Sequence, residues 1–348
     1  MSRERPAAVR RRRQGGAVRA AVRRRARAAR RSRRDPAYGP RGRTGQVSRR
    51  GFLTLADIAI ADWPAVFDRA ALFNQHRLGT SLAGKTVAVV MEKASTRTRV
   101  SFEVGVYELG GHAVVIQTEG SQIARGEPAE DTARVLSSYC QAIVVRTFGQ
   151  ERIAAYARGS TVPVINALTD QHHPCQVATD LFTVRDHFKK LTGLRYAWIG
   201  DGNNMAQSWI EAAGMFGLEL VLACPDGYGP DPQLVNAARA QQAQTGGSIT
   251  LTTSPEEAAT RAHVLSTDVW ASMGQEAEAA KRKASFKGYR IDQALLDRSA
   301  KDSIVLHCLP AHRGEEITSD VLDGPRSLAW VQAANRLPIA KAILERVI

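Results

Sequence analysis

The stretch "KTVAVVMEKASTRTRVSFEVGVYELGG", residues 85–111, contains a strand, a polar loop and a helix. The apolar run 85–91 is typical of a buried strand. The loop after it predicts a helix that begins near Thr98 and ends at Gly110–Gly111, where glycines commonly terminate helices. The same strand-then-helix unit recurs along most of the chain, so it indicates the fold class.

Apolar strands and helices alternate through the rest of the sequence. The strands are predicted at 85–91, 112–117, 142–147, 162–168, 194–200, 218–225, 248–253, 263–270 and 302–310, and the helices at 62–79, 99–111, 127–140, 151–160, 175–191, 204–217, 231–246, 254–262 and 335–348. Near-continuous apolar strands separated by helices are typical of parallel sheets that are covered on both faces. The pattern restarts near Leu194. The expected fold class is therefore α/β, with two doubly wound parallel-sheet domains joined by helices.

Two helix starts carry specific signals. Asp62 is predicted to cap the helix 62–79, with Pro64 in its first turn. Pro338 is predicted to occupy the first turn of the last helix, because proline is favoured there.

The composition excludes several classes of protein. The 348 residues are 44% hydrophobic, which is normal for a globular protein, and no apolar run is long enough to cross a bilayer. The four cysteines, at positions 140, 175, 224 and 308, show no CxxC spacing. That pattern argues against a disulfide framework or a zinc site and favours a reducing cytoplasm.

The basic charge belongs to the first 50 residues. They hold 19 Arg, no Lys and two acids, a net charge of 19 − 2 = +17, which leaves 14 − 17 = −3 for the remainder. A segment of this composition is expected to be disordered by itself. It could bind nucleic acid, target an organelle, or be an upstream extension outside the working protein. The last interpretation is favoured, because aromatic residues are absent from the arginine runs and no basic patch in the body continues them.

The loop at 92–98 is suited to bind an anion. It delivers the side chains of Ser95, Thr96, Arg97 and Thr98 to the start of a helix, where free N–H groups and the helix dipole attract negative charge. Hydroxyl donors beside a guanidinium favour phosphate. A capped helix start with a solvated arginine would look similar in isolation, so the other strand ends decide between the two interpretations.

Polar residues follow the neighbouring strands as well. Arg146 lies at the end of the strand 142–147, and His173 and Gln176 follow the strand 162–168. An imidazole, an amide and a guanidinium at one sheet edge could polarise a carbonyl group. These three side chains extend the predicted anion site.

The second half offers groups that suit an amino acid. "GDGNN" places Asn203 and Asn204 at a helix start, and it lacks the G-x-G-x-x-G spacing of a dinucleotide site. Asp268 offers a carboxylate for an amine. Further candidates at strand ends are Ser272, Met273, Cys308 and Leu309. The sequence has neither a Walker loop nor a hydrolase triad motif, and it shows no metal-ligand spacing.

The motifs "STRTR", "HPCQ", "GDGNN", "DVWASMG" and "HCLPAHRGEE", in this order, resemble those of the ornithine carbamoyltransferases. The resemblance covers residues 48 to 348. The first two motifs are shared with other transcarbamylases, including those that act on aspartate, whereas "SMG" and "HCLP" together are more specific. The resemblance implies transfer of the carbamoyl group of carbamoyl phosphate to the side-chain amine of L-ornithine, which yields L-citrulline and phosphate without a cofactor or a metal.

The resemblance also implies roles for individual residues. Carbamoyl phosphate would be bound by Ser95, Thr96, Arg97, Thr98, Gln122, Arg146, His173, Gln176, Cys308, Leu309 and Arg336. Ornithine would be bound by Asn204, Asp268, Ser272 and Met273. The catalytic residues would be Arg97, Arg146, His173, Asp268 and Cys308. Gln122, in the loop "EGSQIARGEPAED", would reach into the site of a neighbouring subunit of a homotrimer or a multiple of trimers.

The implied organisation has four parts. Residues 1–47 form the basic extension, 48–185 the carbamoyl-phosphate domain, 186–325 the ornithine domain, and 326–348 a C-terminal helix that packs back on the first domain.

Two alternative functions remain open at this point. One is a nucleic-acid-binding protein with the α/β body as a scaffold, and the other is a transcarbamylase for a different amine, such as putrescine or acetylated ornithine. The sequence does not separate an anabolic role from a catabolic one.

Overall fold

The computed structural model describes residues 51–271 and 276–348. The chain divides into a unit of residues 1–47 and a unit of residues 48–348, and the fold below is that of the second unit. The predictions for the basic segment, and those for Ser272 and Met273, lie outside the described residues. Within the described part of the chain, no helix is both long enough and apolar enough to cross a membrane.

The first half is built on a four-stranded parallel sheet. Its strands are β1 (Thr86–Met91), β2 (His112–Gln117), β3 (Ala142–Arg146) and β4 (Val164–Leu168), in the spatial order β2-β1-β3-β4. The helices between them are α3 (Thr96–Glu108), α4 (Ala129–Tyr139) and α5 (Gln150–Gly159). The segment η3 (Ile123–Arg125) is a short 3₁₀ turn between β2 and α4.

The second half is built on a five-stranded parallel sheet. Its strands are β5 (Arg195–Ile199), β6 (Glu219–Ala223), β7 (Ser248–Thr252), β8 (Val264–Thr267) and β9 (Ile304–His307), in the order β7-β6-β5-β8-β9. Its helices are α7 (Asn204–Phe216), α8 (Pro232–Thr245), α9 (Pro255–Ala259), α10 (Ala279–Ser285), α11 (Gln293–Leu296) and α12 (Ser319–Leu322).

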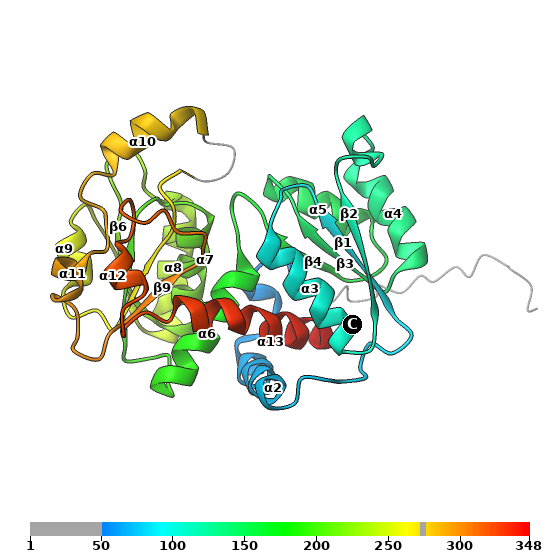
Figure 1. The fold of residues 1–348 in the computed structure, drawn as a ribbon, viewed down its shortest axis with the longest axis horizontal. Helices are drawn as coiled ribbons and strands as arrows, with labels where there is room; N and C mark the ends of the chain where they lie inside the picture. The colour runs from blue at the N-terminus through cyan, green and yellow to red at the C-terminus, as the bar shows by residue number, and fades with distance from the viewer. Residues whose placement is uncertain (1–50, 272–275) are drawn as a thin grey trace, which may run out of the picture. The chain divides into compact units, whose positions relative to one another are not determined.

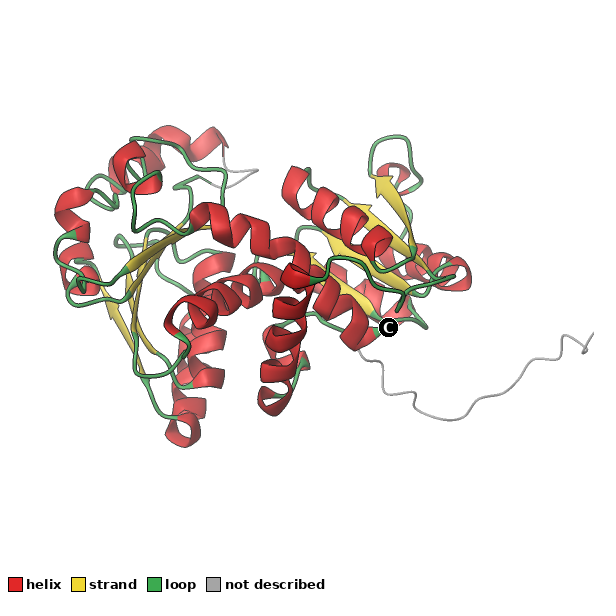
Figure 2. Cartoon of the chain, turned by 60° about the horizontal axis from the view of Figure 1, so that its bottom comes forward, coloured by secondary structure: helices red, strands yellow, loops and turns green. Residues whose placement is uncertain are grey.

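Helices cover both faces of each sheet, as Figure 2 shows. Along β1, Val87 and Val89 belong to the core cluster that includes α2 (Trp63–Gln75), whereas Ala88 and Val90 pack with α4 and α5. Strands buried on both faces explain the near-continuous apolar runs in the sequence. The predicted fold of two doubly wound parallel sheets is confirmed.

Two long helices bridge the halves. The helix α6 (Pro174–Phe188) follows β4 and packs on α7, and α13 (Ala329–Val347) packs against α2, α3, α6 and β9 (Figure 1). Because α13 contacts elements of both sheets, it places side chains from the C-terminal end of the chain next to both halves.

The helix α2 begins at Trp63, with Asp62 at the N-cap position and Pro64 in the first turn, as predicted, although the Asp62 side chain makes no capping hydrogen bond and pairs with Arg346. Two other predicted helix starts differ from the structure. The helix α3 begins at Thr96, earlier than predicted, and Pro338 lies inside α13 because this helix begins at Ala329. A proline removes one helical hydrogen bond, and the carbonyl left without its donor belongs to Ala334, which is exposed and can be hydrated.

The strand order positions the site. In each sheet the order reverses once, between β1 and β3 and between β5 and β8. Ligands of doubly wound sheets bind at such switch points, beyond the carboxyl ends of the strands. Met91 and Arg146, the last residues of β1 and β3, are partners in the ladder, so the loop 92–98 and the Arg146 side chain start from adjacent positions.

Candidate active site

The loop after β1 is organised by its own hydroxyls. The Ser95 side chain accepts a hydrogen bond from the Thr98 backbone N–H at 3.2 Å, which makes Ser95 the N-cap of α3. The Ser95 hydroxyl also lies 3.1 Å from the Thr98 hydroxyl. Thr98 is buried and Thr96 is exposed. The helix start therefore presents ordered N–H groups and hydroxyls beyond the end of β1, as an anion site requires.

Arg97 links this helix start to the second half. Its Nη2 donates to the Leu309 carbonyl at 2.6 Å, in the loop that follows β9. Leu309 adopts a left-handed backbone (φ 56°), which is rare for a residue other than glycine, and its N–H donates to His307 Nδ1 at 2.8 Å. His307 Nε2 in turn lies 3.1 Å from Glu316 Oε1. A buried His–Glu pair thus holds the loop so that the Leu309 carbonyl faces Arg97.

Arg336 comes from α13 and joins the same cluster. Its Nη1 donates to Gln176 Oε1, and its Nη2 lies 3.4 Å from the Thr98 hydroxyl. Both Arg336 and Gln176 are buried. Residues that are far apart in the sequence therefore meet here. Hydrogen bonds join Ser95, Thr98, Arg336 and Gln176, and Arg97, next to Thr98 in the chain, is bonded to Leu309.

The electrostatics of this cluster favour an anion. Burial, Arg336 and Arg97 lower the pKa of Arg146 to about 10. Burial and the neighbouring arginines also lower the pKa of His173 well below its usual range. Arg146 Nε and His173 Nδ1 are buried and have no hydrogen-bond partner among the described residues. Mutually repelling cations with unused donors form a site that a dianion would stabilise.

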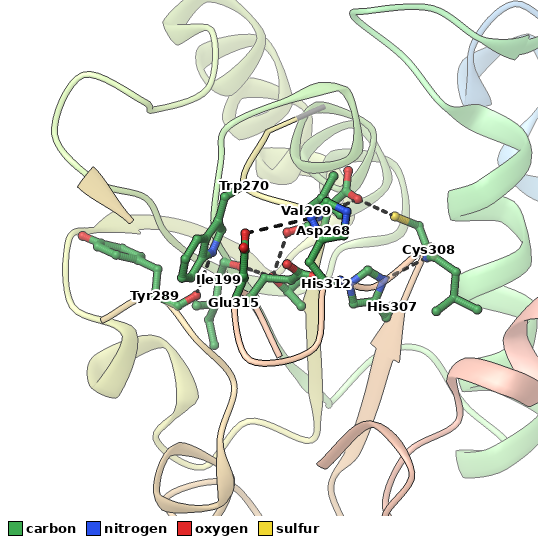
Figure 3. Close-up of polar contacts among 12 residues, drawn as sticks. Ile199, Asp268, Val269, Trp270, Tyr289, His307, Cys308, His312 and Glu315 are labelled. Atoms are coloured by element: carbon green, nitrogen blue, oxygen red, sulfur yellow. Dashed lines mark hydrogen bonds and ion pairs between the residues drawn. The ribbon is translucent and has the colours of Figure 1, made fainter. Parts of the chain in front are cut away.

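The second switch point holds the residues that are predicted to bind an amino acid. Figure 3 shows the Cys308 thiol pointing toward Asp268; the thiol donates to Asp268 Oδ1 at 2.9 Å. The other oxygen of Asp268 accepts from Asn203 Nδ2 at 2.9 Å, across the switch point between β5 and β8. Burial and the adjacent Asp268 carboxylate raise the pKa of Cys308 well above its usual range, so the thiol is neutral near pH 7.

The remaining predicted residues, Asn204 and Gln122, differ in how they lie relative to the site. Asn204 begins α7, but its Nδ2 donates to the Thr169 carbonyl at 2.6 Å, while Asn203 caps the helix. Gln122 is exposed at the start of the turn η3, and the hydrogen bonds among described residues do not join its side chain to the cluster.

Figure 3 also includes His312, which with Glu315 and Glu316 forms the one set of potential metal ligands found among residues 51–271 and 276–348.

Sequence reasoning missed the residues that support the site. Asp180 and Gln332 are buried and hydrogen-bonded to each other, and Asp180 also accepts from Gln176. An acid four residues after Gln176 on the same helix face was the available signal. His307 and Glu316 shape the loop after β9; they lie within the motif "HCLPAHRGEE", which by itself indicates no role for either side chain.

Two family models match the chain. One, described as the aspartate/ornithine carbamoyltransferase carbamoyl-P binding domain, matches residues 50–186, and the other, the Asp/Orn binding domain, matches residues 192–347. The chain belongs to the aspartate/ornithine carbamoyltransferase family.

Within the family, this chain is similar to ornithine carbamoyltransferases. That of Geobacter sulfurreducens is 56% identical over 269 residues, which are 77% of this chain and 87% of the relative. That of Acidothermus cellulolyticus is 53% identical over 297 residues, 85% of this chain and 95% of the relative. The solved structure of the Pyrococcus furiosus enzyme is 42% identical, has a TM-score of 0.82, and is matched over 86% of this chain and 97% of its own.

Proposed function

We propose that this protein is an enzyme that transfers the carbamoyl group of carbamoyl phosphate to the δ-amine of L-ornithine. The observation that carries the proposal is the hydrogen-bonded cluster at the end of β1, in which Arg97 and Arg336 meet Thr98 beside the buried Arg146. This cluster is suited to a phosphate dianion. The carboxylate of Asp268, from the other half, accepts a hydrogen bond from the Cys308 thiol and is suited to bind an amine of ornithine.

The chemistry requires positioning and charge stabilisation. The neutral δ-amine attacks the carbamoyl carbon, a C–N bond forms, the bond between the carbamoyl carbon and the bridging phosphate oxygen breaks, and phosphate leaves with the electron pair of that bond. The attacking nitrogen loses one proton and the leaving phosphate gains one, so the products are citrulline and hydrogen phosphate. Oriented binding can lower such a barrier by about 7–11 kcal/mol, and one oxyanion donor contributes about 3–4 kcal/mol.

We assign Arg97, Arg336 and the start of α3 to the phosphate, and Arg146 and His173 to the carbamoyl oxygen. The low pKa of His173 keeps its imidazole neutral, so it would act as a hydrogen-bond donor and not as an acid. Asp268 is the only member of the Cys308–Asp268 pair that accepts in this arrangement. An amine donates hydrogen bonds, so Asp268 is the better candidate of the two to hold the ornithine α-amine. Asn204, Ser272 and Met273 would then lie at the α-carboxylate.

Exposed apolar side chains support the predicted oligomer. The strand β2 lies at the edge of its sheet, and exposed edges are usually covered. Large apolar side chains that remain exposed on and beside this edge are Val100 and Tyr107 on α3, Val114 on β2, and Val135 and Tyr139 on α4. The loop that carries Gln122 follows β2 directly. In the predicted oligomer, a neighbouring subunit would cover this face.

A citrulline assay with a panel of amines tests the proposed function. Ornithine should be carbamoylated in preference to putrescine, which lacks the carboxylate, and to acetylated ornithine, which lacks the free α-amine. A preference for either alternative would assign the chain to a different transcarbamylase reaction.

Removal of residues 1–47 tests whether the protein is an enzyme or, as in the alternative interpretation, a nucleic-acid-binding protein. The truncated chain, residues 48–348, carries a net charge of 14 − 15 = −1 and holds all the predicted site residues, so it should keep its activity. Loss of activity together with loss of nucleic-acid binding would favour the scaffold interpretation. A cytoplasmic location stays a prediction of the cysteine pattern.

A further inference from the structure

We propose that Asp180 is a positioning residue that fixes the Gln176 amide, and through it Arg336, in the orientation that the phosphate site needs. The proposal rests on the proposed function only in naming carbamoyl phosphate as the ligand. Asp180 lies on α6, fully buried, and does not itself face the anion cluster through any described hydrogen bond.

The orientation of Gln176 follows from the chemistry of its neighbours. Arg336 can only donate hydrogen bonds, so the oxygen of the Gln176 amide must face it. The Gln176 Nε2 then donates to Asp180 Oδ1 at 2.8 Å. If the carboxylate were replaced by a group that cannot accept, the amide nitrogen would lose its partner. The amide could then rotate and turn its N–H₂ group toward the guanidinium.

The same carboxylate oxygen orients a second amide. Gln332, on α13, donates from Nε2 to Asp180 Oδ1 at 2.5 Å, and its Oε1 accepts from the His307 backbone N–H at 2.9 Å. His307 is the last residue of β9 and precedes Cys308 and Leu309. One buried oxygen therefore connects the first turn of α6, the C-terminal helix α13 and, through Gln332, the end of β9.

The contacts of Asp180 are unusual for a purely structural acid. Its Oδ2 is buried and has no hydrogen-bond partner among residues 51–271 and 276–348, and the two hydrogen bonds to Oδ1 come from amides, not from a lysine or an arginine. Burial raises the pKa of Asp180 to about 7, and Oδ1 accepts in either protonation state, because Oδ2 can carry the proton. A buried carboxyl group in such surroundings is costly to retain. What it provides is the fixed direction of two amides, one of which holds a cation of the anion site.

Three variants separate positioning from stability. Asp180→Leu keeps the branched shape of the side chain and removes the acceptor, although leucine is larger, and Asp180→Asn keeps one acceptor oxygen. The matched control is Thr183→Val, one turn further along α6, because the Thr183 hydroxyl accepts from Asn335 of α13 at 3.0 Å and has no link to Gln176. Inorganic phosphate is titrated calorimetrically into each variant without ornithine, and the KM values of both substrates and the thermal midpoint are measured.

Asp180→Leu should weaken phosphate binding and raise the KM of carbamoyl phosphate by about tenfold or more, the size expected for a lost charge-assisted contact. The KM of ornithine should change by less than about threefold, because no ornithine contact is assigned to this network. Asp180→Asn should stay within about threefold of the wild type, since one oxygen can accept from both amides. Thr183→Val should lower the thermal midpoint and leave both KM values unchanged.

A double-mutant cycle with Gln176→Leu provides the decisive test. If Asp180 acts through Gln176, Asp180→Leu should change phosphate affinity by no more than about twofold when Gln176 is already replaced. Independent, multiplying effects would overturn the proposal, and so would wild-type phosphate affinity in Asp180→Leu. Asp180→Ala is the second variant if the leucine does not fold, and failure of both to fold would show that the role is structural.

The two hypotheses fail in different ways. A wild-type protein that makes no citrulline would contradict the proposed function. The phosphate titrations of the same variants do not depend on turnover, so they would still test the role of Asp180.

Discussion

Replacement of Arg146 by methionine should make the empty protein more stable and abolish its stabilisation by phosphate. Arg146 is buried, its Nε has no partner among the described residues, and two other guanidinium groups lie close enough to affect its protonation. Methionine has a similar length and no charge. The substitution therefore removes a repelled cation while filling most of its volume.

The magnitude follows from the pKa. Burial and the neighbouring arginines lower the pKa of Arg146 from 12.5 to about 10, a difference of 2.5 units, which corresponds to about 3 kcal/mol against the charged form in the folded state. The folded pKa is the lower one, so this destabilisation is present at every pH below about 10. Since methionine also loses favourable contacts of the arginine, we expect a net gain of about 1–3 kcal/mol.

Thermal unfolding with and without inorganic phosphate measures both effects. A ligand at a hundred times its Kd stabilises the wild type by about 2.7 kcal/mol, and the Arg146→Met variant should show almost none of this increase. The matched control is Arg134→Met on α4, where the arginine is exposed and pairs with Asp131 at 3.3 Å; it should change neither quantity. An Arg146→Met protein that is less stable than the wild type, or that keeps the phosphate response, would refute the reasoning.

Three further predictions concern assembly, pH and binding order. Mixing inactive Gln122→Ala subunits with inactive Arg97→Ala subunits should restore part of the citrulline activity, because mixed rings contain intact sites; no recovery after confirmed subunit exchange would contradict shared sites. The kcat/KM for ornithine should rise about tenfold per pH unit from about pH 6 to 8.5, as the amine of pKa about 10.4 loses its proton. His173 and Cys308 stay uncharged in that range, so a flat profile would exclude amine deprotonation from this step. Finally, ornithine should bind more weakly to the empty protein than to the phosphate-bound protein, and equal affinities in calorimetry would argue against ordered binding.

The sheets could be predicted because their signal is local. Strands that are buried on both faces, such as β1 and β3, appear in the sequence as short apolar runs, and each is followed at once by its loop. Arg97 and Arg146 could be placed for the same reason. Arg146 ends β3 and Arg97 lies in the first turn of the helix that follows β1, and in a parallel sheet the carboxyl ends of the strands share one edge.

The supporting residues could not be predicted because their partners are distant. Gln332 and Asp180 are 152 positions apart, and nothing in the local pattern of either segment indicates the other. The prediction of where α13 begins was wrong for a related reason. Pro338 favours a helix start in isolation, but packing of α13 against α2, α3 and α6 stabilises the helix on both sides of the proline.

The electrostatics of the cluster also explain why phosphate should bind first. Ornithine carries a net positive charge near neutral pH, so the unpaired cations of the empty site repel it. A phosphate dianion bound beside Arg97, Arg146 and Arg336 would lower their combined charge from +3 to 3 − 2 = +1 and so weaken this repulsion, and because the site is largely buried, this change would be weakly screened. The same dianion also lowers the free energy that the empty protein holds in repulsion between its arginines. Order of binding and stability of the empty fold are therefore two consequences of one arrangement, in which three cations are held together before the anion arrives.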